Sequence, residues 1–562
     1  MRTGAPAMDD DPTPPSHFWS GLKYGAVKVA RGAGLYGMTL AGRRAPPPAI
    51  IPPDPFAGDP ERGAQIVDGA FVFAGERIAQ ARNPWGAIGA GPGWLEEANG
   101  FAWLGDLVAH GGQAAQDRAR ALVADWIAAD TAGKLEAGEV AWRADVTGRR
   151  VWSWLVRYAW LVEGASDAEQ TALLESLGRQ VRHLSRVAGH EGRDEGRLAG
   201  IAGYVVATLC LANWAEERRE AIGLMGEELE PAILPDGCHA TRSPRVQVRV
   251  LKELTGLRDV FRAAQQPVPT ALQTAIDRMA PMVRFFRHGD GGLALFNDSR
   301  EGDPSEIDSV LALADARGRP PKRAPHGGFE RLVAGRLCLL VDVGAPPPAG
   351  YDGHAHAGAL SLEVSAGQER LIVNCGAALR PDSDWSAAQR ATAAHSVLGV
   401  GDTNSTEIAR LAEGAGAGKR RARTESERRE AEDSIWLDVA HDRYWQRFGV
   451  TYRRRLFLAA GGEDLRGQES LEGEAGQAFT IRFHLHPKVQ VSLLHNHTAA
   501  LLRTPSGQGW RLRASGADMG LTDSVYLGRG EGKRSQQLIL TGVTGSDGAT
   551  VKWALQRETK KG

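Results

Sequence analysis

The sequence has few cysteines, no long apolar run and no excess of charge of either sign. Its 562 residues include four cysteines, and these are widely separated without Cys-x-x-Cys spacing. This pattern excludes a disulfide framework and a thiolate zinc site. No run reaches the roughly 18 apolar residues that a membrane-spanning helix needs. Lys and Arg (67) nearly equal Asp and Glu (68), so the overall charge excludes a polycationic nucleic-acid-binding protein.

The N-terminal part also lacks an ordinary secretion signal, because no basic start leads into an apolar core with a small-residue cleavage site. This absence predicts a cytoplasmic protein. Residues 18–44 mix aromatic and aliphatic side chains with basic ones. That mixture predicts either a lead-in that packs on the body or a peripheral contact with a membrane surface. Residues 45–59 are rich in proline, so we predict a partly ordered lead-in over residues 1–59.

Helical spacing dominates the next part of the chain. Leu122, Val123 and Trp126 belong to one of several apolar sets that return at the period of an amphipathic helix. Ser166 followed by Glu169 fits a capping box and marks the start of another helix. Repeated helices with short links favour a helical bundle or an (α/α) toroid. We predict a toroid domain over residues 60–320.

The period changes to two in the C-terminal part. Leu360, Leu362 and Val364 alternate with other residues, and similar alternation returns several times further along. Turn-forming residues separate these strands, and no helix of comparable length intervenes. We therefore predict an antiparallel β-sandwich over residues 321–562. Residues 413–432 are glycine-rich and then densely charged, which predicts a solvated loop between strands.

The residues best suited to chemistry are histidines near the first of these strands. His354 and His356 lie two apart at its predicted start, so both imidazoles would lie on one face. Asn374 and His395 follow at predicted strand edges. Three nitrogen or oxygen donors without a thiolate suit zinc or another divalent ion, although Asn is a weaker ligand than Asp. The alternative for Asn374 is the capping of a turn.

These segments resemble the C-terminal domain of the heparinase II/III family. The resemblance is carried by GHAHAG (353–358), LIVNCG (371–376) and RATAAHSVLGVGDTNS (390–405). Upstream, ILPDGCHATRSP (233–244) and FRHGDGGLALFND (286–298) resemble the helical half of bacterial members. The resemblance implies an (α/α) toroid joined to a β-sandwich. It also implies a polysaccharide lyase acting on uronic-acid, glycosaminoglycan-like glycans in a cleft between the two domains.

The resemblance also implies roles for individual residues. His354 matches the catalytic histidine, and His356, Asn374 and His395 match the metal positions, where metal-binding members usually carry Asp in the middle place. Cleavage by β-elimination needs a base, a group that neutralises the uronate carboxylate, and an acid. Apart from the resemblance, Arg242 and Arg245 each have a guanidinium whose geometry suits that carboxylate. The alternative for both is a solvated arginine.

Two parts of the lyase pattern are missing. The segment GRDEGRLAGIAGY (192–204) lacks the Asn-His pair, and RSPRVQV (242–248) lacks the acid-base tyrosine. Tyr204, His239 and Tyr351 are the candidates to replace these groups, and we expect the last two to bind substrate. The alternative function is a noncatalytic glycan-binding or cell-envelope assembly protein. A glycan-active protein suits the periplasm or cell envelope, which stands as the alternative to the cytoplasm predicted above.

A hydrolase is the third interpretation. It would need two facing carboxylates, with Asp194 and Glu195 as candidates.

Overall fold

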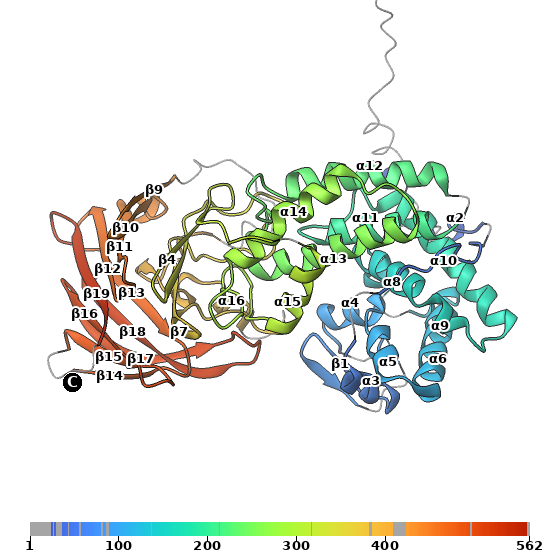
Figure 1. Ribbon diagram of the computed structural model, residues 1–562, viewed down its shortest axis with the longest axis horizontal. Coiled ribbons are helices and arrows are strands. Elements are labelled where there is room, and N and C mark those ends of the chain that lie inside the picture. Colours follow the sequence, from blue (N-terminus) through green and yellow to red (C-terminus); the bar gives the residue numbers. More distant parts are fainter. Residues whose placement is uncertain are drawn as a thin grey trace, which may run out of the picture.

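The computed structural model has two halves, one of helices and one of two stacked sheets (Figure 1). It describes residues 24–558 except for 26, 28, 30–35, 43, 55–57, 80–82, 86–88, 136–137, 213, 316, 381–384, 408–422 and 495–496. The predicted division into a helical part and an antiparallel sandwich is confirmed. The changeover lies between residues 313 and 323. Part of the predicted lead-in at 1–59, and of the membrane-contacting segment 18–44, lies outside the described residues.

The helical half contains one small hairpin, β1 (Phe71–Phe73) with β2 (Glu76–Ile78). The predicted capping box at Ser166 and Glu169 is confirmed at the start of α10. The helices are α2 (Tyr36–Thr39), α3 (Pro60–Val67), α4 (Pro92–Gly100), α5 (Leu104–His110), α6 (Gly112–Thr131), α7 (Gly138–Ala141), α8 (Ala144–Val156), α9 (Tyr158–Val162), α10 (Asp167–Val187), α11 (Gly196–Cys210), α12 (Ala215–Ala232), α13 (Pro244–Ala263), α14 (Thr270–Phe285) and α15 (Pro304–Leu313).

Glycines let α8 and α11 pack with their backbones nearly in contact. A Cβ built on Gly203 would lie 2.3 Å from the Cα of Gly148, and one built on Gly148 would lie 2.4 Å from the carbonyl oxygen of Ala199. Any side chain at these places would push the helices apart. The close packing fixes the position of α11 against α8. The residues just before α11 belong to the candidate site.

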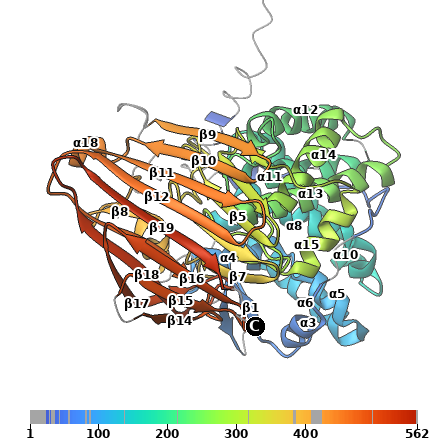
Figure 2. The same ribbon diagram turned by 60° about the vertical axis from the view of Figure 1, so that its left-hand side comes forward.

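The sandwich consists of an outer sheet of eight strands and an inner sheet of nine strands that faces the helical half (Figures 1 and 2). The outer order is β14 (Gln490–Leu493), β15 (Ala499–Arg503), β16 (Gly509–Ser515), β19 (Ala549–Arg557), β12 (Asp464–Gly473), β11 (Val450–Ala459), β10 (Ser434–His441) and β9 (Thr424–Ala431). The inner order is β17 (Asp518–Tyr526), β18 (Lys533–Val543), β13 (Ala478–Leu485), β7 (Glu369–Val373), β6 (Leu362–Ala366), β5 (Leu337–Asp342), β4 (Phe329–Ala334) and β3 (Arg323–Ala324), with β8 (Leu398–Val400) also pairing with β13. Short helical turns α16 (Trp385–Ala388), η1 (Thr392–Ala394) and α18 (Trp445–Phe448) connect strands.

The predicted loop at 413–432 is wrong in its second half. Residues 413–422 lie outside the described residues, but Thr424–Ala431 forms β9, which pairs along its whole length with β10. The strand lies at the edge of the outer sheet and exposes most of its side chains, so it carries charged residues where a central strand would carry apolar ones.

A buried ion pair anchors the sandwich core. Arg454 and Glu469 are both fully buried, with 3.0 Å between Nε and the carboxylate oxygens. Tyr452 (2.6 Å) and the indole of Trp553 (2.8 Å) also donate to this carboxylate. A second guanidinium nitrogen donates to the carbonyl oxygen of Leu360 at 2.6 Å. The sandwich core therefore holds the end of the loop that carries His354 and His356.

Arg242 joins the two halves. It directly precedes the cap residue of α13 and adopts a left-handed backbone conformation (φ 56°). Its buried guanidinium donates to the carbonyl oxygens of Gly327 (2.7 Å), Gly328 (3.1 Å) and Ala345 (2.7 Å), and it pairs with Asp342 at the end of β5. The start of α13 is thereby tied to the inner sheet.

No helix in the described part of the chain is long and apolar enough to cross a membrane.

We expect Arg242→Met to lower the free energy of unfolding by about 3–5 kcal/mol, because Asp342 would stay buried without its partner charge. Urea titration followed by tryptophan fluorescence measures the change. Arg503→Met removes an exposed arginine of β15 and is the control, with an expected change within about 0.5 kcal/mol. The double variant Arg242→Met/Asp342→Asn should recover part of the loss. Equal stabilities of Arg242→Met and the control would contradict the role of this pair.

Candidate functional site

His354 and His356 lie in a loop between β5 and β6, because β6 begins only at Leu362. The prediction that they start a strand and share one face is therefore wrong. The two rings have different partners: His354 contacts the helical half, and His356 contacts His395. Glycine and alanine neighbours produce a turn here rather than an extended segment.

The loop of His354 is clamped by the residues that precede α11. The backbone N–H of Asp194 donates to the carbonyl oxygen of Gly350 at 2.6 Å, and the N–H of Gly353 donates to the Asp194 carboxylate at 3.0 Å. Arg193 forms an ion pair with the buried Asp352 at 2.7 Å. Both halves of the molecule therefore contribute to one site.

His354 lies between two carboxylates. Its Nδ1 is 2.8 Å from Asp298, and its Nε2 is 3.1 Å from Glu195. Only an imidazole protonated on both nitrogens can donate to both acceptors at once. The side chain is 18% exposed, so it stays accessible to a ligand.

Helix α13 supplies the cations that balance these acids. Arg245 and Arg249 are four residues apart, which places them on one face of the helix. Arg245 pairs with Asp298 at 2.6 Å, and Arg249 pairs with Glu195. Burial alone would raise the pKa of Asp298, but Arg245 and His354 hold that pKa well below its ordinary value. The result is a compact cluster of alternating charges.

Strained backbone surrounds this cluster. Asp194 (φ 52°), Asn297 (φ 46°), Asp298 (φ 58°) and Leu360 (φ 62°) all adopt left-handed conformations, which L side chains rarely do. The Asn297 side chain accepts from the N–H of His356 and donates to the carbonyl oxygen of the residue before the α13 cap. Such strain persists where surrounding contacts impose it, and it is typical of functional sites.

His356 and His395 form a hydrogen-bonded pair with 3.3 Å between Nδ1 of the first and Nε2 of the second. The N–H of Asp298 donates to His356 Nε2, and His395 Nδ1 donates to the carbonyl oxygen of Ala391. These contacts assign both tautomers, with His356 donating to His395. Burial lowers the pKa of both imidazoles, so the pair is neutral.

The donors at this pair do not fit zinc. The side-chain oxygen of Asn374 accepts from the N–H of Ser396 at 2.9 Å, and its Nδ2 is a buried amide nitrogen, which has no lone pair to give a metal. Two imidazoles are left, whereas zinc sites use at least three protein ligands. No group of three or more His, Cys, Asp or Glu suited to a metal occurs among the described residues. We derive no chemistry from a metal here.

The three residues predicted to bind substrate are buried, and their polar groups are used within the protein. Arg242 is committed to the contact between the halves. His239 is fully buried, and burial lowers its pKa to about 3. The hydroxyl of Tyr351 donates to Glu228 at 2.9 Å. These three residues are therefore buried behind the site. The partly exposed cations of the cluster are Arg245 and Arg249.

No tyrosine hydroxyl forms a hydrogen bond with His354 in the described part of the chain. His354 donates to Glu195 and Asp298, and the Arg245 guanidinium, which pairs with the same Asp298, lies 3.5 Å from His354 Nδ1. Tyr204 is fully buried in the helical core, where burial raises its pKa far above the ordinary value. Glu195 and Arg245 were among the candidates from the sequence, whereas Asp298 and Arg249 were not. The motif FND at 296–298, which ends the segment that resembles the family, could have indicated Asp298.

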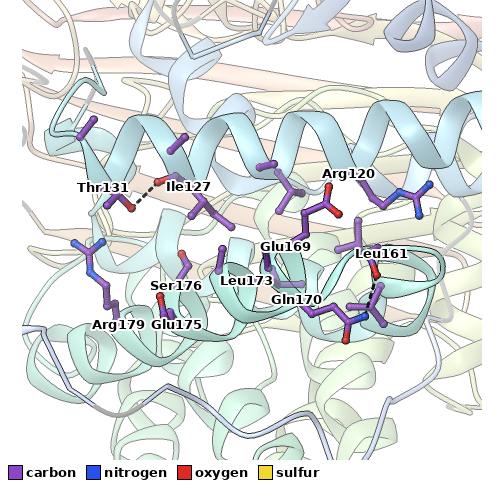
Figure 3. Close-up of a pocket in the computed structure, with 18 residues that line it drawn as sticks. Arg120, Ile127, Thr131, Leu161, Glu169, Gln170, Leu173, Glu175, Ser176 and Arg179 are labelled. Carbon is purple, nitrogen blue, oxygen red and sulfur yellow. Dashed lines mark hydrogen bonds between the residues drawn. The ribbon is translucent and has the colours of Figure 1, made fainter.

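A separate cavity of about 660 Å³ lies between α6 and α10 (Figure 3). Alanine and leucine side chains line it, with Arg120, Glu169 and Arg179 at its margin. It shares no residue with the His354 cluster. Its described lining residues include no histidine, cysteine or tyrosine, and Glu169 is used in the capping box of α10. The His354 cluster therefore remains the candidate reactive site.

Comparison with known proteins agrees with this architecture. A family model described as heparinase II/III-like, C-terminal, matches residues 316–554. FtsZ-localized protein C of Caulobacter vibrioides is 32% identical over 547 residues, which is 94% of this chain and 93% of that protein. A crystal structure of heparinase III superposes with a TM-score of 0.71 at 12% identity, covering 97% of this chain and 92% of that one. Heparan sulfate lyase HepC from Pedobacter heparinus gives 0.61 at 13%, covering 96% and 91%.

Asp298→Asn should reveal the electrostatics of the cluster through its pH dependence. Because folding lowers the pKa of Asp298, its carboxylate stabilises the fold above its ordinary pKa of 3.8, and this contribution is lost as the pH falls through the folded value. We expect the stability gap between wild type and variant to be constant from about pH 7 to about pH 5 and to shrink below 3.8. Urea titrations at each pH measure it. A gap unchanged down to about pH 3 would contradict the assignment.

A carboxylate at position 374 should create a zinc site. Asn374→Asp would add a carboxylate beside His395, and we expect this variant to retain about one zinc per chain after dialysis, whereas wild type retains none. Elemental analysis of the purified proteins measures this. Asn404→Asp, at an exposed position, is the control. Stoichiometric zinc in the wild type would show that the site accepts the amide after all.

Proposed function

Because the chain belongs to the heparinase II/III-like family, we propose that it cleaves an acidic, uronic-acid-containing glycan by β-elimination at the His354 site. The observation that carries this proposal is the cluster in which His354 lies between Glu195 and Asp298 and is flanked by Arg245 and Arg249. It combines an acid, a base and cations at one accessible place. Those are the groups that the reaction requires.

The cations would neutralise the carboxylate of the substrate. Arg249 is about a third exposed and pairs with a single protein carboxylate, and its guanidinium matches a uronate carboxylate in geometry. When the glycan carboxylate pairs with Arg249, it takes the place of Glu195. The displaced Glu195 carboxylate then becomes available as a base.

His354 and Glu195 would share the proton transfers. Glu195 removes the proton next to the uronate carboxylate while a carbon–carbon double bond forms. The glycosidic carbon–oxygen bond breaks, and the protonated His354 gives its proton to the departing oxygen. Asp298, 2.8 Å from Nδ1, orients the ring of His354. This scheme replaces the missing tyrosine with a carboxylate and an imidazolium.

The second candidate is a noncatalytic glycan-binding protein of cell-envelope assembly. Two observations favour it: both ring nitrogens of His354 are already paired, and no tyrosine hydroxyl hydrogen-bonds His354 among the described residues. A similar protein is named for its localisation with FtsZ, and we propose that this chain localises in the same way. Both candidates place an acidic glycan at one site and differ only in turnover.

The first candidate predicts a product with a conjugated double bond. Incubation of wild type with a panel of uronic-acid polysaccharides should raise the ultraviolet absorbance of that bond. His354→Ala should abolish the rise, and Glu195→Gln should slow it by about 100-fold or more, because proton transfer loses its base.

Two comparisons separate the candidates. His110→Ala removes an exposed histidine of α5 and should leave the rate unchanged. A flat trace for wild type across the panel, with glycan binding still measurable and weakened by Arg249→Ala, would reject elimination and support the noncatalytic function. If wild type neither cleaves nor binds any polysaccharide of the panel, the proposal of an acidic glycan at this site is rejected.

A further inference from the structure

The outer face of the eight-stranded sheet has a groove of about 690 Å³ that the proposed function does not use. This face points away from the helical half and is turned toward the viewer in Figure 2. The groove crosses β10, β11, β12, β19 and β16, so it shares no residue with the His354 cluster. Its volume is in the range of ligand sites, about 300–1,000 Å³.

The hollow results from side chains of unequal length in one row. Phe457 lies opposite Arg466, Arg466 opposite Ala554, and Ala554 opposite Arg513. Side chains in such a row point to the same face of the sheet. Short Ala554 between two long arginines leaves an open floor with raised sides.

An aromatic pair forms one end of the groove. Trp436 and Phe457 are register partners on β10 and β11, with ring centroids 4.7 Å apart and planes inclined by 61°. Trp436 is 50% exposed although it is a large apolar side chain. The indole N–H donates to the hydroxyl of Ser434 at 3.2 Å, which orients the ring. A fixed, open indole offers a flat apolar face with a polar edge, which suits the apolar face of a sugar ring.

The groove also has an excess of positive charge. Arg455, Arg466, Arg513 and Lys552 line it, and none of its described lining residues is acidic. Arg455 pairs with Asp438 and Arg466 with Asp464, each at 2.9 Å.

The other two cations have no such partner. Arg513 and Lys552 are exposed and form no ion pair with another described residue. They are separated from the aromatic pair by the open floor at Ala554. Two uncompensated cations attract an anionic ligand, and the aromatic end requires that ligand to carry apolar faces as well.

We propose that this groove is a second binding site for an acidic glycan chain. Sugar rings stack on Trp436 and Phe457, while Arg513 and Lys552 bind the carboxylate or sulfate groups. The glycan class rests on the proposed function; the groove itself is defined by its own residues. A site on the outer sheet would hold one part of the glycan polymer while the His354 site binds or cleaves another part. This raises the local concentration of the glycan at the His354 site.

Two other occupants fit the groove less well. An extended peptide adds to the edge of a sheet, but here the strands that form the floor already pair on both sides. A second copy of this chain docking face to face would bring four cations against four cations. An acidic peptide held by side chains alone and an anionic membrane surface are tested as outcomes below.

The test measures retention of the full-length protein in gels that contain polygalacturonate, with dextran gels as the neutral reference. Trp436→Ala and Arg513→Glu/Lys552→Glu are expected to weaken retention by about tenfold each. Trp445→Ala and Arg503→Glu change an equally exposed tryptophan and an exposed arginine outside the groove, and both should behave as wild type. All of these side chains are exposed, so we expect folding to be preserved.

The same proteins in the elimination assay separate this proposal from the proposed function. His354→Ala should lose turnover while its retention keeps its dependence on Trp436. If Trp436→Ala and the double charge reversal are retained like their controls, the groove is not a glycan site, whatever the turnover. Groove-dependent binding to polyglutamate or to phosphatidylglycerol vesicles, without binding to polygalacturonate, would also overturn the proposal.

Discussion

The candidate site depends on the contact between Arg242 and the inner sheet. This one guanidinium ties the residue before the cap of α13 to Asp342 at the end of β5. Arg245 and Arg249 follow on the same helix, and the loop with His354 follows the same strand. Holding the helix and the strand together therefore brings the members of the charged cluster into reach of one another. Burying the two charges of this contact costs desolvation free energy, but the contact fixes the start of α13 against the inner sheet.

Much of the fold could be predicted from periodicity, because helices and strands bury their apolar residues at different spacings. The capping box at Ser166 was predictable for the same local reason. The edge strand β9 was not, since its charged, exposed residues resemble those of a loop and only pairing with β10 identifies it. The loop of His354 was mistaken for a strand because the alternation that follows it begins later, at Leu362.

The site was predictable only in part. Motif resemblance found His354, His356 and His395, but it could not show that Asn374 gives its oxygen to Ser396. Side-chain chemistry alone was also misleading for Arg242, whose guanidinium suits a substrate carboxylate but is buried in the protein. Asp298 and Glu195 meet His354 from positions 56 and 159 residues away in the chain, and no local pattern reports such contacts. The sequence thus indicates which residue types the site contains, and only the folded structure shows which of them hydrogen-bond or form ion pairs.

The charged strand β9 has a consequence for the molecule as a whole. A sheet of eight strands ends in open backbone donors and acceptors, which invite another sheet to join. On β9, glutamates and arginines occupy five of the eight positions, in the order TESERREA. A neighbouring strand could pair there only by matching that order of charges. At this edge, the charges therefore oppose strand pairing between copies of the sandwich.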